Sequence, residues 1–282
     1  MINGKCVALR HGQIIGNMNF EHKVIWIIGA SSGIGAGLAK ALAVQKARLI
    51  ITSREYAALR SLEAQLEGHT GCMILPADMT DNTALTQVVA HAISAYGHID
   101  IVIHSAGVGQ RSLAIDTQLS VYHQLMNVNF FGPLTITQYL LPHFKRQGHG
   151  HVVAISSMSG LMGFPMRSGY VASKHALKGY FETLQVEHTL NNFYVTIVSP
   201  GRIKTGLSLS ALTGDGAPYD KMDEGQLNGI PVNECAVKIL TAISRKKKHV
   251  IIARSERLLY WLRILLPPAY YRIARKRGMG NQ

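Results

Sequence analysis

The chain has 282 residues, of which 47% are hydrophobic and 16% are charged, a composition that excludes a disordered protein and suffices for one large α/β domain or two small ones. Three widely separated cysteines, Cys6, Cys72 and Cys235, argue against a disulfide framework and against a thiolate zinc site. The net charge is +13, and residues 245–282 hold eleven basic side chains and one acid. The basic character therefore belongs to the C-terminal segment, and the rest of the chain is nearly neutral.

Apolar runs and helical periodicity alternate along the chain. The first run, Val24–Ile28, ends in a glycine-rich turn, and a helix over 34–44 and a strand over 49–52 complete a βαβ unit. The further expected elements are helix 56–66, strand 73–75, helix 85–96, strand 101–104, helix 121–145, strand 152–155, helix 171–190, strand 195–198, helix 232–243 and strand 250–252. Strands that are apolar on both faces and separated by helices predict a Rossmann-type, doubly wound parallel sheet with helices on both faces, in one domain over residues 20–253.

Three segments lie outside this regular pattern. Residues 1–19 lack an apolar core of signal-peptide length and are expected to form a flexible arm. Residues 206–230 follow the sixth strand and are interrupted by glycine and proline, which indicates a mobile substrate lid or, alternatively, an ordinary surface insertion. Residues 254–282 are expected to form a basic, amphipathic helical extension.

The turn after the first strand has the sequence GASSGIG and opens the first helix. Glycine allows the backbone to turn sharply and to approach a phosphate closely, and the free N–H groups of a helix N-terminus favour an anion. The strand, turn and helix together predict that a dinucleotide pyrophosphate binds here. The residues assigned to this site are Gly29, Ser31, Ser32, Gly33, Ile34 and Gly35.

The second strand ends in Ser53 and Arg54, where a dinucleotide-binding fold meets the adenosine ribose. An acidic residue would accept a hydrogen bond from a free 2′-hydroxyl, whereas the planar cation of Arg54 suits a 2′-phosphate. The sequence therefore favours NADP(H) over NAD(H). The alternative is a solvated arginine at a strand end.

Tyr170 and Lys174 are four residues apart and so lie on one face of a helix. A nearby ammonium favours the tyrosinate and lowers the pKa of the phenol towards the neutral range, so the pair suits acid/base work. Ser157 follows the strand over 152–155, and we expect the strand end and the helix start to bring its hydroxyl beside the phenol. The alternative for the pair is an ordinary contact on a helix surface.

These motifs, in this order and at these spacings, resemble the short-chain dehydrogenase/reductase family over about residues 23–252. The resemblance implies a catalytic set of Asn129, Ser157, Tyr170 and Lys174, with Asn129 anchoring a water and Lys174 also holding the nicotinamide ribose. It further implies contacts to the cofactor from Asp78, Met79, Ala106, Gly107, Pro200, Gly201, Ile203 and Thr205.

One motif departs from the family pattern. His104 and Ser105 stand where the family usually has two asparagines before Ala-Gly, which leaves the usual amide contact in doubt. The two residues could replace part of that contact by hydrogen bonding. A lone histidine at a strand end is more often structural, so we do not assign His104 as a catalytic base. We also expect no metal, because no acid or cysteine cluster completes a site around His149 and His151.

The resemblance implies an oxidoreductase that uses NADP(H) to interconvert a carbonyl and a secondary alcohol by hydride transfer. In this reaction Tyr170 serves as acid/base and Ser157 hydrogen-bonds the carbonyl oxygen. The alternatives are a catalytically idle NADP(H)-binding regulator that acts through a partner, and a nucleic-acid-binding protein, which no recognition motif supports. A homodimer or homotetramer is expected from the same resemblance.

The segment 254–277 mixes aromatic and aliphatic residues with arginines and is broken by Pro267 and Pro268. It is too short to cross a bilayer but suits an interface, which predicts peripheral attachment to the inner face of a membrane by a cytoplasmic protein. Packing on the domain itself or on a second subunit is the alternative. This segment and the apolar lid residues Leu207, Leu209 and Leu212 favour a lipophilic substrate.

Overall fold

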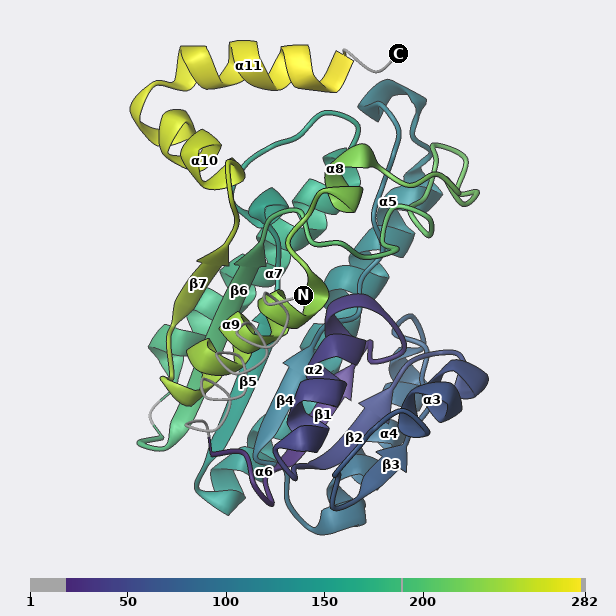
Figure 1. The fold of residues 1–282 in the computed structure, drawn as a ribbon, viewed down its shortest axis with the longest axis vertical. Coiled ribbons are helices and arrows are strands. Elements are labelled where there is room, and N and C mark those ends of the chain that lie inside the picture. Colours follow the sequence, from purple (N-terminus) through teal and green to yellow (C-terminus); the bar gives the residue numbers. More distant parts are fainter. Residues whose placement is uncertain (1–18, 189, 280–282) are drawn as a thin grey trace, which may run out of the picture.

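The structure, a computed structural model, describes residues 19–188 and 190–279 (Figure 1). The expected arm over residues 1–19 therefore lies, apart from residue 19, outside the described residues. Seven parallel strands form one sheet in the order β3-β2-β1-β4-β5-β6-β7. They are β1 (Val24–Ile28), β2 (Arg48–Thr52), β3 (Cys72–Ile74), β4 (Ile101–His104), β5 (Gly150–Ile155), β6 (Phe193–Pro200) and β7 (His249–Ile252).

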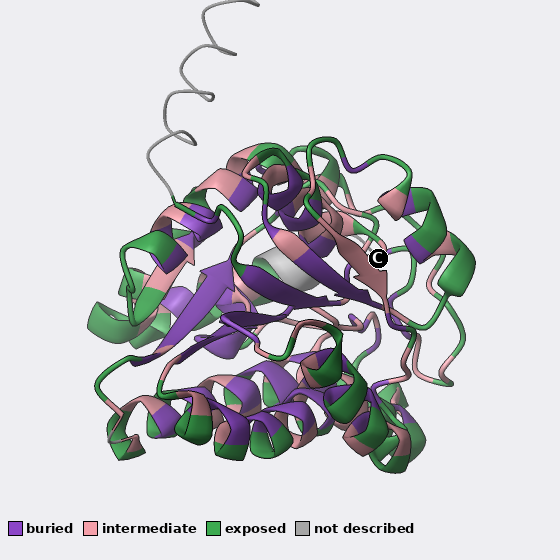
Figure 2. Cartoon of the chain, turned by 90° about the horizontal axis from the view of Figure 1, so that it is seen from below, coloured by how far each residue is buried: buried purple, intermediate pink, exposed green. Residues whose placement is uncertain are grey.

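Helices cover both faces of the sheet, which confirms the predicted Rossmann-type architecture (Figure 2). The longer helices of the two layers are α2 (Gly33–Val44), α3 (Tyr56–Glu63), α4 (Asn82–Tyr96), α5 (Leu119–Met126), α6 (Gly132–Gln147), α7 (Ser168–Glu187) and α9 (Val232–Ser244). The short helices are η1 (Ala114–Asp116), η3 (Met158–Gly160) and α8 (Glu224–Leu227).

The two layers divide the side chains of each strand between them. Along β1, Ile25 and Ile27 pack with α2 and α9, whereas Trp26 and Ile28 pack with α4, α6 and α7. Successive side chains of a strand point to opposite faces, so both faces must be apolar when both are covered. This explains why the strands read as continuous apolar runs in the sequence.

The expected helix over residues 121–145 is interrupted in the structure. A π-helical turn, η2 (Asn127–Phe131), separates α5 from α6. Proline follows immediately at position 133, in the first turn of α6, where its missing N–H is tolerated. Such π turns are frequent at functional sites, and this one contains Asn129.

The excursion over residues 206–230 lies across the carboxyl ends of the strands and is bound to the loop after β4. Leu212 forms backbone hydrogen bonds with Gly109 and Arg111, and the Gln118 N–H donates to the carbonyl of Gly214. Leu212 is buried with Val121 and Leu125 of α5. Backbone hydrogen bonds and apolar contacts thus hold the expected lid against its neighbours.

Two helices form the C-terminal extension, α10 (Glu256–Leu265) and α11 (Pro267–Met279), as expected for this region (Figure 1). Tyr270 is 2% exposed and packs with Met158, Leu161 and Met162, and its hydroxyl donates to the carbonyl of Gly163. One side of the extension therefore packs on its own domain, directly behind the end of β5. None of the helices among the described residues combines the length and the apolar character that crossing a bilayer requires.

Candidate active site

A cavity of about 710 Å³ opens at the carboxyl edge of the sheet. It is lined by the segments that follow β1, β2, β3, β4, β5 and β6, and the lid supplies one wall. The strands β1 and β4 are neighbours in the sheet, but the helices that follow them lie on opposite faces. Ligands of doubly wound sheets bind at the carboxyl ends of two such strands. Of the predicted site residues, all line the cavity except Gly35 and Asn129.

The glycine turn fits a site where backbone must approach a ligand. Gly29 has φ +83°, and an added Cβ would lie 2.4 Å from the backbone nitrogen of Ala106. Gly33 has φ +54° and begins α2, which has no side-chain cap at its N-terminus. Gly35 is buried behind the turn, where a Cβ would lie 2.0 Å from the carbonyl oxygen of Gly29. Gly35 thus allows close packing of turn and helix, and the other residues face the cavity.

The ends of β2 and β3 supply the polar groups at the far end of the cavity. Ser53 and Arg54 line it, and so does the adjacent Glu55. Asp78 also lines the cavity, and its carboxylate accepts hydrogen bonds of 2.8 Å from both the N–H and the hydroxyl of Thr80. The local turn therefore fixes the carboxylate of Asp78.

Ser157, Tyr170 and Lys174 meet where the end of β5 faces the first turns of α7. The Ser157 hydroxyl accepts from the Ser159 N–H at 3.1 Å and lies close enough to the Tyr170 phenol to lower its pKa. The ammonium of Lys174 donates to the carbonyl of Ile155 at 3.0 Å and lies 5.9 Å from the centroid of the Tyr170 ring. Tyr170 is 7% exposed and Lys174 is 4% exposed, so both groups are shielded from water.

Burial controls the titration of both groups. It raises the pKa of Tyr170 above its ordinary value, although the nearby Ser157 hydroxyl and the charges of Arg167 and Arg111 act in the opposite direction. It lowers the pKa of Lys174 to about 8. The sequence predicts a Tyr170 pKa lowered by Lys174, whereas in the structure desolvation outweighs the lowering contributions. Arg167 lies only three residues before Tyr170, whereas Arg111 comes from the loop after β4, which sequence spacing does not bring to the site.

Asn129 lies behind the cavity, in the π turn η2, and is fully buried. Its amide oxygen accepts from the Val108 N–H at 2.8 Å, and its amide nitrogen donates to the Val108 carbonyl and to the Ser173 hydroxyl. A Cβ added to Gly107 would lie 3.2 Å from the amide oxygen and 3.3 Å from the ammonium of Lys174. Asn129 therefore joins the loop after β4 to helix α7, close to Lys174.

His104 occupies a structural position. Its Nε2 lies 2.9 Å from the Thr137 hydroxyl, and that hydroxyl donates to the carbonyl of Pro133. Nε2 must therefore carry the hydrogen, which leaves Nδ1 as a buried acceptor with no hydrogen-bond partner among the described residues. Burial lowers the pKa of His104 to about 3, so the ring is neutral. Ser105 lines the cavity, and its N–H donates to the carbonyl of Ile28.

The structure adds residues that the sequence does not indicate. Ser210 and Gln226 of the lid line the cavity beside Leu207 and Leu212, which the sequence does indicate, whereas the third predicted lid residue, Leu209, is 39% exposed. Gln110 and Arg111, from the loop after β4, lie close to the start of α7. No motif marks these positions, because they come from irregular segments. Among the described residues, no three His, Cys, Asp or Glu side chains are placed to hold a metal ion.

Residues 23–214 match the family described as short chain dehydrogenase. The chain belongs to the short-chain dehydrogenase/reductase family. It is 37% identical over 267 residues to the dehydrogenase/reductase SDR family member 7B of Bos taurus, covering 92% of this chain and 82% of that protein. It is also 37% identical over 263 residues to the SDR family protein 7-like of Anopheles gambiae, covering 91% and 83%. These findings make this short-chain dehydrogenase an oxidoreductase by family.

Solved structures share the fold. A short-chain dehydrogenase from Streptomyces avermitilis superposes with a TM-score of 0.76 at 25% identity, covering 92% of this chain and all of that one. A short-chain dehydrogenase/reductase from Burkholderia phymatum, solved with NAD, gives 0.79 at 20% identity, covering 87% and 94%. An alcohol dehydrogenase from Thermococcus sibiricus, solved with 5-hydroxy-NADP, gives 0.71 at 23% identity, covering 82% and 96%.

The residues present fit a nicotinamide dinucleotide. A Cβ at Gly29 would collide with the Ala106 backbone, and one at Gly33 would lie 3.3 Å from the side chain of Thr205. Because neither residue carries a side chain, the backbone of the turn can pack closely beside the cavity. The uncapped start of α2 offers N–H groups to a pyrophosphate. Ile203 and Thr205 close the opposite wall.

We expect Lys174→Met to stabilise the protein, because the buried ammonium forms no ion pair with any carboxylate in the part of the chain that the structure describes and bonds instead to a neutral carbonyl. A lysine titrates near 10.5 when unfolded and near 8 here, so folding is penalised below pH 8 and the penalty disappears as the pH rises towards 10.5. The variant should gain about 1–3 kcal/mol in the free energy of unfolding at pH 7, part of the gain being offset by the lost bond to Ile155. Urea unfolding from pH 6 to 10.5 measures the difference.

Lys178→Met is the matched control, since Lys178 lies one turn further along α7 and pairs with Glu182. It should show little change in stability over the same pH range. A Lys174→Met protein that is less stable than wild type at pH 7 contradicts the interpretation.

Proposed function

We propose that this short-chain dehydrogenase uses NADP(H) to interconvert a carbonyl and a secondary alcohol, with Tyr170 as the acid/base. The contact between Ser157 and Tyr170 at the cavity wall, with Lys174 beside them, is the observation that supports this proposal. A protein that only binds the cofactor has no need of this arrangement. When bound, the nicotinamide supplies or accepts the hydride.

The side chains account for the proton and for the charge on oxygen. In the reductive direction, the Tyr170 hydroxyl donates its proton to the carbonyl oxygen. The Ser157 hydroxyl hydrogen-bonds the same oxygen, where negative charge develops. Lys174 holds positive charge close to the phenol, at 5.9 Å from the ring centroid, and a positive charge favours the tyrosinate that forms. Asn129 holds the backbone of Val108 beside Lys174, and we propose that it anchors a water there.

Tyr170→Phe should reduce turnover by about 10²- to 10⁴-fold, or roughly 3–5 kcal/mol of barrier, because the proton donor is removed. NADPH absorbance with a panel of lipophilic and small carbonyls measures the rate. Tyr180→Phe, on the same helix but bonded to Gln138, is the control and should keep wild-type turnover.

Full activity of the Tyr170→Phe protein would refute the mechanism. If wild-type protein binds NADPH but oxidises it with none of the carbonyls, the result supports the alternative, a regulator that binds NADP(H) and acts through a partner.

The preference for NADP(H) rests on Arg54. This side chain is exposed at the end of β2 and lines the cavity, where it is free to meet a 2′-phosphate. The related structures were solved with NAD and with an NADP derivative, so the family allows either. A guanidinium pairs with a phosphate through two parallel hydrogen bonds, which favours the phosphorylated cofactor.

Arg54→Ser should lower kcat/KM for NADPH about 10- to 150-fold. A hydrogen bond to a charged group contributes roughly 1.5–3 kcal/mol, and its loss corresponds to a change of this size. The value for NADH should change little. Arg48→Ser, at the opposite end of the same strand and over the Tyr96 ring, is the control. Equal losses with both cofactors would contradict the proposed role of Arg54.

The outer side of the extension supports contact with an anionic membrane surface. Leu258, Trp261 and Leu265 recur at helical spacing on α10 and are 73%, 49% and 71% exposed. Exposed arginines at positions 257, 272 and 275 accompany them. Apolar side chains among cations suit a lipid interface better than a nucleic acid. The extension lies beyond the carboxyl ends of β6 and β7, the edge where the cavity opens (Figure 1).

We therefore propose a cytoplasmic enzyme at the inner face of a membrane that takes a lipophilic substrate. Leu207 and Leu212 of the lid line the cavity and suit such a substrate. Assembly as a homodimer or homotetramer is proposed by resemblance to the family. Exposed apolar side chains on the outer helices, Tyr139 of α6 and Val186 of α7, are available for such contacts.

Replacing Leu258 and Leu265 together with glutamate should reduce binding to vesicles of phosphatidylcholine and phosphatidylserine by about tenfold or more, because two apolar side chains no longer enter the lipid. Co-sedimentation measures the bound fraction. Val44→Glu, at an equally exposed apolar position on α2, should bind like wild type. Unchanged binding of the double variant would refute the membrane proposal.

A further inference from the structure

Gln110 is a fully buried polar side chain in the loop between β4 and η1, outside the predicted catalytic set. Every polar atom of its amide has a partner. The amide oxygen accepts from the N–H of Gly169 at 2.7 Å and from the N–H of Tyr170 at 3.2 Å. The amide nitrogen donates to the hydroxyls of Ser112 and Thr117, both at 3.1 Å. Donors on one side and acceptors on the other fix the orientation of the amide.

These contacts make Gln110 the cap of helix α7. The first N–H groups of a helix have no partner within the helix and usually bond to the side chain of the preceding residue. Here that residue, Arg167, makes no such bond. Instead, the amide oxygen of Gln110 accepts the hydrogen bond from the Gly169 N–H, although Gln110 lies 59 residues before Gly169 in the sequence. Tyr170 lies in this first turn, so the backbone of the catalytic residue itself is held by Gln110.

The packing around Gly169 shows how tightly the cap is fitted. A Cβ at Gly169 would lie 2.8 Å from Leu125 of α5 and 3.2 Å from the amide oxygen of Gln110. The start of α7 is therefore seated against both α5 and the loop after β4. A small shift of this loop would move the backbone of Tyr170 with it.

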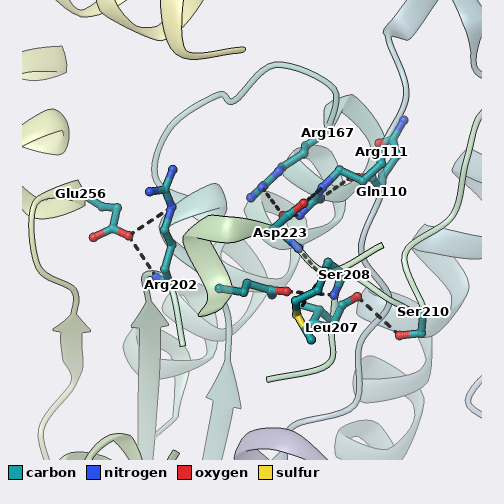
Figure 3. Close-up of polar contacts among 11 residues, drawn as sticks. Gln110, Arg111, Arg167, Arg202, Leu207, Ser208, Ser210, Asp223 and Glu256 are labelled. Atoms are coloured by element: carbon teal, nitrogen blue, oxygen red, sulfur yellow. Dashed lines mark hydrogen bonds and ion pairs between the residues drawn. The ribbon is translucent and has the colours of Figure 1, made fainter. Parts of the chain in front are cut away.

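The lid is connected to the same place. Arg111, the next residue, forms an ion pair with Asp223 of the lid, and Arg167 lies 3.4 Å from the same carboxylate (Figure 3). The Arg111 N–H also donates to the carbonyl of Leu212. Gln110 thus stands where the lid, the loop after β4 and the start of α7 are joined.

We propose that Gln110 is a positioning residue for the acid/base step: by capping α7 it fixes Tyr170 relative to Ser157. The inference rests on the proposed function of Tyr170. Ser157 belongs to the end of β5 and Tyr170 to α7, so their contact depends on where the helix begins. Positioning errors of about 1 Å cost up to about a hundredfold in rate. Gln110 is not among the residues that line the cavity, so we expect cofactor binding not to depend on it.

The test compares Gln110→Met, which keeps the length but removes both hydrogen-bonding groups, with Gln110→Glu, which keeps acceptors for the two N–H groups. Gln110→Met should lower kcat about ten- to a hundredfold while leaving the Kd for NADPH unchanged. Gln110→Glu should recover part of the lost kcat. Hydrogen exchange at the amides of Gly169 and Tyr170 should accelerate in Gln110→Met and be slowed again in Gln110→Glu.

Gln147→Met is the matched control, because Gln147 also bonds backbone groups, those of Ile99, but at the opposite edge of the sheet. It should lose stability without losing kcat at temperatures where it is folded. A Gln110→Met protein with wild-type kcat overturns the proposal, and so does a loss of kcat without faster exchange at Gly169 and Tyr170. Failure of the proposed function is recognised separately, because Tyr170→Phe would then be as active as wild type.

Discussion

The close approach of α7 to the end of β5 places a phenol, a hydroxyl and an ammonium side by side. Lys174 donates from its side chain to the carbonyl of Ile155 and accepts through its own carbonyl from the Ser156 hydroxyl. A Cβ at Gly160 would lie 2.8 Å from the carbonyl oxygen of Lys174, so only glycine at this position lets η3 pack so close to α7. The same pair of elements carries Ser157 and Tyr170. The cavity, the lid and the cap on α7 all take their places around this contact.

Positive charge accumulates around the site at a cost to stability. Burial lowers the pKa of Lys174 to about 8 and that of Arg167 to about 10, and the charge of Arg111 adds to the second effect. Asp223 provides a carboxylate for the two arginines, but Lys174 bonds to a neutral carbonyl. Buried charges of this kind lower stability unless they are paired, and they are common where chemistry requires them. The well-packed sheet with apolar residues on both faces offsets that cost.

Sequence reasoning succeeded where a local pattern has a single physical meaning. Continuous apolar runs such as Val24–Ile28 predict strands buried on both faces, and the glycines predict a sharp backbone turn, which Gly29 makes with φ +83°. It failed where partners are distant. The cap on α7 comes from Gln110, and the π turn around Asn129 breaks a helix whose periodicity continues through it. The pKa of Tyr170 depends on burial, which only the folded chain reveals.

The extension has two chemically different sides. Leu259, Leu262 and Tyr270 face the segment that follows Ser157, whereas Leu258 and Leu265 face solvent. A substitution on the inner side creates a packing defect next to Ser157, whereas one on the outer side leaves the packing unchanged and alters only the exposed surface. Related chains are thus free to vary the outer side of the extension without disturbing the packing beneath it.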